Sequence, residues 1–195
     1  MTIDVEKIGR KIVEDLLKEA ASEVGPCFFP GAFKPPHRGD FEAAKYLATK
    51  NYINRVYVVI SRVEKLGVTA EDSLYIWNEY LKSDPDPKIK VIISEHESPV
   101  EDVYFFIKNH FQVDPVYVAA EATEVEGEGG YGNLKKNFPD RVRIETIPAE
   151  YTNINREEML AAAKSKNYKK FIKYVPEISY NKGAAENIFS RLSEK

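Results

Sequence analysis

The sequence predicts an α/β fold: a doubly wound, five-stranded parallel sheet with an N-terminal helix and a C-terminal helical tail. Two observations carry this prediction. Five short runs rich in Val, Ile, Phe or Tyr recur along the chain, and amphipathic helical patterns lie between them. Strands that alternate with helices form parallel sheets covered by helices on both faces, and right-handed crossovers make such a sheet doubly wound.

The first predicted element is an amphipathic helix over residues 3–24, where apolar residues recur every three or four positions between charged ones. Five strands follow, each bounded by polar or proline-containing turns. They are Cys27–Phe29, Val56–Ser61, Lys90–Ser94, Val116–Ala120 and Val142–Ile147.

The segments between the strands predict helices, and so does the end of the chain. The helices between strands are Phe41–Lys50, Ala70–Lys82, Val100–Asn109 and Tyr131–Asn137. Helical patterns in the tail cover residues 155–164, 167–174 and 183–192. The stretch from Glu121 to Gly132 is acidic and rich in glycine, and it predicts a solvated loop.

Length and composition favour a single soluble domain over residues 1–195. It divides into the N-terminal helix (1–24), an α/β core (25–150) and the helical tail (151–195). The net charge of −3 argues against nucleic acid as a partner. No apolar segment approaches the roughly 18 residues that span a bilayer, so we expect no membrane partner. The single cysteine, Cys27, forms no intramolecular disulfide, which suits a cytoplasmic protein.

Residues 31–40, Gly-Ala-Phe-Lys-Pro-Pro-His-Arg-Gly-Asp, form the most informative stretch. They follow the apolar strand Cys27–Phe29 and precede a predicted helix. A strand that leads through a basic turn into a helix N-terminus presents free backbone N–H groups and a positive dipole end to an anion. In open parallel sheets, ligands bind at the carboxyl ends of the strands, where the strand order reverses. The stretch therefore predicts a phosphate-binding loop.

The same stretch resembles the GxFxPxHxGH signature of the nucleotidylyltransferase superfamily. Gly31, Phe33, Pro35, His37 and Gly39 match it. The last position departs from it, because an aspartate stands where the family has its second histidine. The run of residues 60–77 resembles superfamily members found in tailed bacteriophages, for which the compartment would be the host cytoplasm.

The resemblance implies a Rossmann-like fold and an enzymatic activity. Such enzymes transfer a nucleotidyl group from ATP or CTP to a small phosphate-bearing or hydroxyl acceptor and release pyrophosphate, with Mg²⁺ neutralising charge. Catalytic roles would fall to His37, which would hydrogen-bond the phosphates, and to Lys34 as a second phosphate contact. The implied nucleotide-binding residues are Gly31, Ala32, Phe33, Gly39, Ser61, Arg62 and Arg156. From the residues alone, the alternatives are that His37 is a loop histidine bonded to a neighbouring carbonyl and that Lys34 is a solvated loop lysine.

Asp40 has a structural and a functional interpretation. Aspartate is a preferred N-cap, so it predicts the start of the next helix. A carboxylate there would also repel a phosphate by about 4 kcal/mol at ~4 Å with an effective dielectric of ~20, or about three orders of magnitude in affinity. A bridging Mg²⁺ would remove this repulsion. The functional interpretation therefore makes Asp40 a catalytic residue and a Mg²⁺ ligand.

A second departure lies at the start of the tail. The superfamily usually carries an ISxTxxR pattern there, and the corresponding region is Tyr151–Leu160. Arg156 is one residue too far from Thr152 to fit the pattern. Two interpretations stay open: Arg156 reaches the site from a helix start, or it is a surface arginine paired with an acidic neighbour.

Three functions are compatible with these features. The first is a nucleotidylyltransferase. The second is a catalytically degenerate nucleotide-binding or protein-interaction module of the same fold, because both phosphate-gripping motifs depart from the pattern. The third is a structural protein without a nucleotide site. The sequence does not distinguish ATP from CTP, it does not identify the acceptor, and it leaves open a homo-oligomer.

Overall fold

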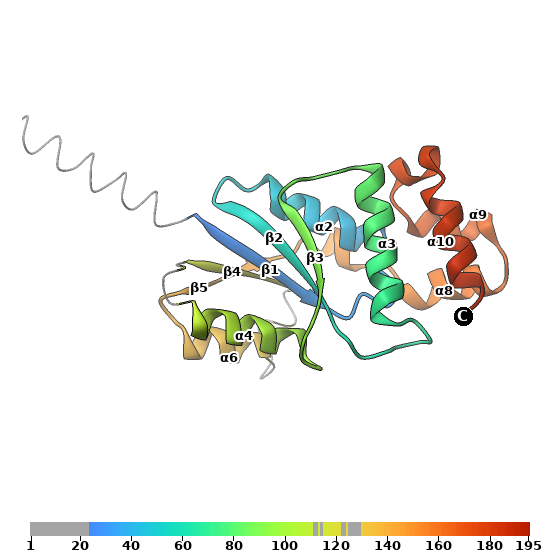
Figure 1. Cartoon of the computed structure of the whole chain (residues 1–195). Coiled ribbons are helices and arrows are strands. Elements are labelled where there is room, and N and C mark those ends of the chain that lie inside the picture. The colour runs from blue at the N-terminus through green and yellow to red at the C-terminus, as the bar shows by residue number, and fades with distance from the viewer. Residues whose placement is uncertain (1–23, 111–112, 114, 122–123, 125–129) are drawn as a thin grey trace, which may run out of the picture.

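The computed structural model describes residues 24–110, 113, 115–121, 124 and 130–195 (Figure 1). Nearly all of the predicted N-terminal helix and part of the predicted loop 121–132 lie outside the described residues. None of the helices in the described part is both long and apolar enough to span a membrane.

The predicted five-stranded sheet is confirmed. All strand pairs are parallel, in the order β3-β2-β1-β4-β5, so the order reverses between β1 and β4. Each strand lies within a few residues of its predicted range. The strands are β1 (Gly25–Gly31), β2 (Ile53–Ile60), β3 (Ile89–Ile93), β4 (Val116–Ala120) and β5 (Val142–Thr146).

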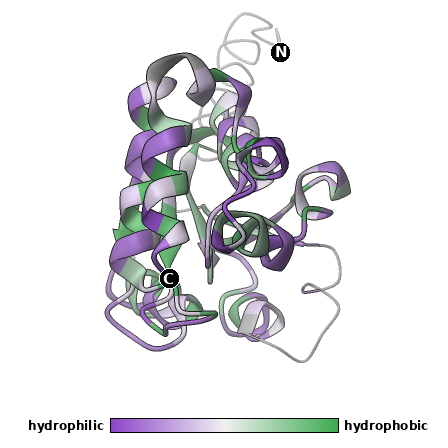
Figure 2. Ribbon diagram, turned by 90° about the vertical axis from the view of Figure 1, so that its right-hand side faces the viewer, coloured by the Kyte–Doolittle hydropathy of each residue, from purple (hydrophilic) through white to green (hydrophobic). Residues whose placement is uncertain are grey.

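Helices cover both faces of the sheet, as the doubly wound prediction requires (Figure 1). On one face lie α2 (Arg38–Thr49) and α3 (Ala70–Ser83). On the other lie α4 (Pro99–Asn109) and α6 (Gly130–Asn137). The alternation of side chains along β1 matches this arrangement, because Cys27 and Phe29 belong to one buried cluster and Phe28 to another. Figure 2 shows the hydrophobic strands between helices that carry hydrophilic outer faces.

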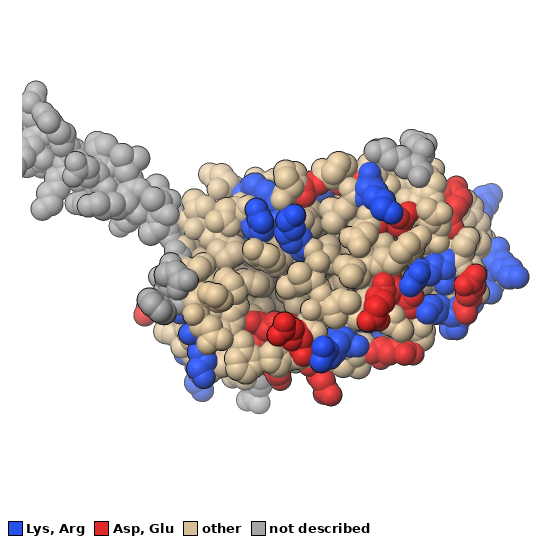
Figure 3. All heavy atoms as spheres, in the orientation of Figure 1, with Lys and Arg blue, Asp and Glu red and all other residues tan. Residues whose placement is uncertain are grey.

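The predicted helical tail is confirmed as a series of short helices. They are α7 (Ala149–Thr152), α8 (Arg156–Lys164), α9 (Tyr168–Phe171), the 3₁₀ turns η1 (Ile172–Tyr174) and η2 (Glu177–Lys182), and α10 (Ala184–Ser193). The last of these packs beside α3, where Asp72 accepts from Arg191 Nε at 2.8 Å and pairs with Lys195 Nζ at 2.7 Å. In Figure 3 both signs of charge are interspersed over this end of the molecule, so this face shows no large patch of one sign.

The start of α2 corrects the prediction that Asp40 is the N-cap. His37 is the N-cap, and Asp40 is the third residue of the helix. The Asp40 backbone N–H donates to His37 Nδ1 at 3.2 Å, and the His37 backbone N–H donates to Asp40 Oδ2 at 2.8 Å. This reciprocal capping box satisfies two backbone donors at once, which a cap at Asp40 would not do.

Candidate functional site

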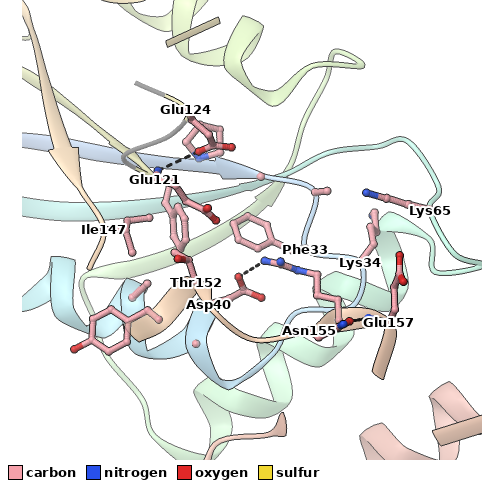
Figure 4. A pocket seen from close by; sticks show the side chains of 18 of the residues that line it. Phe33, Lys34, Asp40, Lys65, Glu121, Glu124, Ile147, Thr152, Asn155 and Glu157 are labelled. Atoms are coloured by element: carbon pink, nitrogen blue, oxygen red, sulfur yellow. Dashed lines mark hydrogen bonds and ion pairs between the residues drawn. The ribbon is translucent and has the colours of Figure 1, made fainter. Parts of the chain in front are cut away.

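A cavity of about 480 Å³ opens at the carboxyl ends of β1, β4 and β5, beside the position where the strand order reverses. The end of β1 and the loop after it form one wall, and residues 151–157 form another. Lys65 and Leu66, from the loop after β2, complete the rim. In Figure 4, Asp40 lies between Glu121 and Glu124 on one side and Asn155 and Glu157 on the other. The phosphate-loop stretch predicted from the sequence therefore lines this cavity.

Side chains from both faces of the sheet hold the backbone that leads into and through this loop. From α3, Ser73 Oγ donates to the Phe33 carbonyl at 2.6 Å, and the Tyr80 hydroxyl donates to the Pro36 carbonyl at 3.1 Å. From α6, the Tyr131 hydroxyl donates to the Pro30 carbonyl at 3.1 Å. All three bonds are buried, so the loop is rigidly placed before any ligand arrives.

The space around Gly31 is limited by a neighbouring side chain of the protein as well as by any phosphate that approaches its backbone. A Cβ on it would lie 2.8 Å from the ring of Phe33, which fills the adjacent space. The ring itself is 2% exposed and packs edge-on against Phe29 and Trp77. Gly31 thus allows the Phe33 ring to fold back over the end of β1.

Lys34 is the most unusual residue of the site. Its side chain lines the cavity yet is only 1% exposed, and its Nζ has no hydrogen-bond partner among the described residues. Burial lowers its pKa from 10.5 to about 8, against the opposing effect of the nearby carboxylates of Glu71, Asp72 and Glu64. A buried ammonium without a hydrogen-bonded partner is destabilising, and an anion in the cavity would relieve that cost.

The pKa of Lys34 gives a testable pH dependence for anion binding. Below about pH 8 the ammonium is charged and attracts phosphate, and above it the charge is lost as the pH rises. Affinity for a nucleotide is therefore expected to be flat from pH 7 to 7.5 and to fall by up to tenfold per unit above pH 8. Calorimetric titrations at half-unit steps measure this. An affinity that stays constant to pH 9.5 would contradict a role for the Lys34 charge.

His37 is neutral and fully buried. Burial, together with the charges of Arg156 and Arg38, lowers its pKa from 6.5 to about 3. Because its Nδ1 accepts from the Asp40 N–H, the ring proton resides on Nε2. This Nε2 finds no acceptor in the described part of the chain. The neutral ring can therefore act only as an uncharged hydrogen-bond donor through Nε2. The ring is not among the described groups that line the cavity.

Asp40 and Arg156 form an ion pair in the wall of the cavity (Figure 4). Arg156 Nη2 lies 2.5 Å from Asp40 Oδ1. Burial raises the pKa of Asp40 from 3.8 to about 6, and the Arg156 guanidinium opposes that rise. Asp40 is therefore ionised at neutral pH. The sequence left two placements open for Arg156, at the site or on the surface beside an acidic residue. In the structure Arg156 lies in the cavity wall and is paired with an acidic residue, Asp40.

Close packing between α2 and α7 brings Arg156 there. A Cβ on Gly39 would lie 1.9 Å from the Tyr151 carbonyl oxygen, so only glycine allows this approach. Asn155 then caps α8, accepting from the N–H groups of Glu157 and Glu158 at 2.9 and 3.1 Å. Arg156, the first residue of α8, consequently starts beside the N-terminal turn of α2.

The structure does not bring every predicted residue to the cavity. Ser61 and Arg62 are absent from its described lining, and Ser61 Oγ donates instead to the Glu97 carbonyl at 3.1 Å. Conversely, Lys65, Glu121 and Asn155 line the cavity without having been predicted. Glu121 directly follows a predicted strand and Asn155 begins a predicted helix. These positions were the signals in the sequence that could have placed the two residues at the site.

The described residues do not fit a protein-held Mg²⁺ at Asp40. One carboxylate oxygen accepts from the His37 N–H and the other binds the Arg156 guanidinium. Across the part of the chain that the structure describes, no three His, Cys, Asp or Glu side chains group closely enough to hold a metal ion. In the free protein the Arg156 guanidinium is the cation beside Asp40, and a Mg²⁺ bridge from Asp40 to a phosphate stays a prediction.

Comparisons with known proteins give a match in fold. No protein-family model matches the chain, and no curated protein matches its sequence. Two similar solved structures are of Plasmodium falciparum nicotinic acid mononucleotide adenylyltransferase. The complex with NaAD has a TM-score of 0.57 at 15% identity, over 86% of this chain and 98% of that one. The complex with APC has a TM-score of 0.58 at 14% identity, with the same coverage.

This chain shares its fold with that Plasmodium falciparum enzyme. The match covers nearly the whole of the neighbouring chains, so the shared fold extends from the sheet into the helical tail. At this identity the likeness concerns the fold.

Proposed function

We propose that this protein is a nucleotidylyltransferase that uses ATP or CTP, transfers the nucleotidyl group to a small phosphate-bearing or hydroxyl acceptor, and releases pyrophosphate. The observation that carries the proposal is the buried, unpartnered ammonium of Lys34 in the wall of a cavity at the strand ends. Adenylyltransferases that share the fold have been seen with NaAD and APC, which supports a nucleotide as the ligand.

The proposed reaction needs positioning and charge stabilisation rather than a covalent protein intermediate. An acceptor oxygen attacks the α-phosphorus of the nucleotide, the bond from that phosphorus to the bridging oxygen breaks, and pyrophosphate leaves with the electron pair. The Lys34 ammonium and the Arg156 guanidinium would stabilise the charge that develops on the phosphates. His37, which is buried behind the cavity wall, would hold Asp40 and the start of α2 in place through the capping box. Mg²⁺ enters this proposal as the counterion that accompanies the nucleotide.

Calorimetric titration of ATP and of CTP, each with Mg²⁺ and with EDTA, tests the binding part of the proposal. We expect one of the two nucleotides to bind saturably in the micromolar to low millimolar range. Turnover is then followed as pyrophosphate release from that nucleotide. The first acceptor to try is nicotinic acid mononucleotide, because the fold neighbour is named for it. Failure of both nucleotides to bind at millimolar concentration would overturn the proposal.

One observation favours a second candidate, a nucleotide-binding module without turnover. An ionised carboxylate, Asp40, lies in the cavity wall at the position where the superfamily signature has a histidine. Binding of ATP or CTP without pyrophosphate release, for any acceptor tried, would favour this candidate. Pyrophosphate release above the uncatalysed rate would exclude it.

A further inference from the structure

The Asp40–Arg156 pair joins two parts of the chain with different freedom to move. Asp40 is 5% exposed and is fixed within the capping box of α2. Arg156 is the first residue of α8, its side chain is 32% exposed, and its Nε has no partner among the described groups. Any rearrangement of this pair therefore moves the guanidinium and leaves the carboxylate in place.

We propose that Asp40 is a positioning residue: it holds the Arg156 guanidinium in the cavity wall of the free protein and yields it to a phosphate of the bound nucleotide. This inference rests on the proposed function and specifies how the site exchanges an internal anion for the substrate anion. In the free protein both carboxylate oxygens of Asp40 have protein partners, and the Arg156 guanidinium is the one that the nucleotide would draw away.

The chemistry of the two anions explains the exchange. A guanidinium presents its donors in a planar fork that matches a carboxylate and a phosphate equally well, so the two compete for it. A nucleotide phosphate carries more charge than Asp40 and has Lys34 in the same cavity as a second cation. The carboxylate keeps the flexible guanidinium in the cavity wall, and the nucleotide phosphate must displace the carboxylate in order to bind the guanidinium. Asp40 therefore lowers nucleotide affinity while it keeps Arg156 at the site.

A double-mutant cycle tests the exchange. Asp40→Asn, Arg156→Gln and the double variant are titrated with whichever of ATP and CTP binds the native protein, in Mg²⁺ and in EDTA. Asparagine retains the shape of aspartate and can still accept from the His37 N–H, so the cap of α2 is kept. Thermal unfolding of each variant shows that it is folded.

Asp40→Asn is expected to tighten nucleotide binding at least tenfold in the native background and by less than threefold in the Arg156→Gln background. Without Arg156, burial favours the protonated form of Asp40, so its replacement changes little charge. Arg156→Gln alone is expected to weaken binding at least tenfold. The control is Glu157→Gln, which removes a carboxylate from the exposed rim of the cavity and is expected to change affinity by less than threefold.

The other outcomes separate this inference from the proposed function. Equal tightening by Asp40→Asn in both backgrounds would show a general charge effect and overturn the exchange. Weaker binding in Asp40→Asn that appears only with Mg²⁺ would make Asp40 a metal ligand and overturn it too. If the native protein and all variants fail to bind either nucleotide, the proposed function itself fails.

Discussion

Replacing Lys34 by methionine is expected to weaken nucleotide binding about a hundredfold while leaving the protein as stable as before or more stable. The substitution removes a buried ammonium that has no described hydrogen-bond partner and keeps the apolar stem that fills the space. A charge-assisted hydrogen bond to phosphate contributes about 1.5–3 kcal/mol, and burying an unpaired charge is costly in the free protein. Calorimetric titration and urea denaturation measure the two effects.

Lys65→Met is the matched control, because Lys65 lines the same cavity but is exposed to solvent. Solvent screening limits its contribution, so we expect its loss to weaken binding by less than tenfold. Should Lys34→Met lower the free energy of unfolding and leave nucleotide affinity unchanged, the lysine would be a structural residue and the anion site would lie elsewhere.

Replacing Gly39 by alanine is expected to lower the free energy of unfolding by about 3 kcal/mol, the upper part of the usual range for overpacking. The added Cβ would meet the Tyr151 carbonyl oxygen at 1.9 Å, and backbone on both sides leaves no flexible side chain to yield. The strain must separate α2 from the segment that carries Arg156, so nucleotide affinity should fall together with stability. Chemical denaturation and calorimetry on the same samples follow both quantities.

The sign of this effect distinguishes it from helix propensity. Glycine to alanine within a helix normally stabilises by up to about 1 kcal/mol, so a more stable variant would contradict the packing. Gly183→Ala serves for comparison. Gly183 has a φ of 71° with nothing within 4 Å of an added Cβ, and its replacement should cost only about 1 kcal/mol from the left-handed backbone.

The sheet could be predicted because the sequence patterns that indicate its strands and helices each lie within a short segment of the chain. The apolar runs and helical periodicities that define the strands and helices lie in consecutive residues, and the right-handed crossovers between parallel strands follow a general rule. The place of residues 31–40 beside the cavity was predictable for the same reason, since they carry both a turn pattern and the resemblance to a family signature.

The assembly of the site was less predictable, because it depends on contacts between distant segments. Nothing in the spacing around Arg156 indicates that it meets Asp40, which lies 116 residues earlier. That contact follows from the packing of Gly39 against Tyr151. The preference of aspartate for N-cap positions also predicted the wrong cap. The capping box pairs His37 with Asp40 at the usual spacing, but with a histidine in place of the usual serine or threonine.

Asp72 interacts with residues near the C-terminus and also affects the pKa of Lys34. It accepts from Arg191 and pairs with Lys195, and its negative charge is also one of those that hold the pKa of Lys34 up against burial. The two cations partly neutralise the field that Asp72 exerts on Lys34. Natural variation at positions 191 and 195 would therefore tune, from outside the site, the pH at which Lys34 loses its charge.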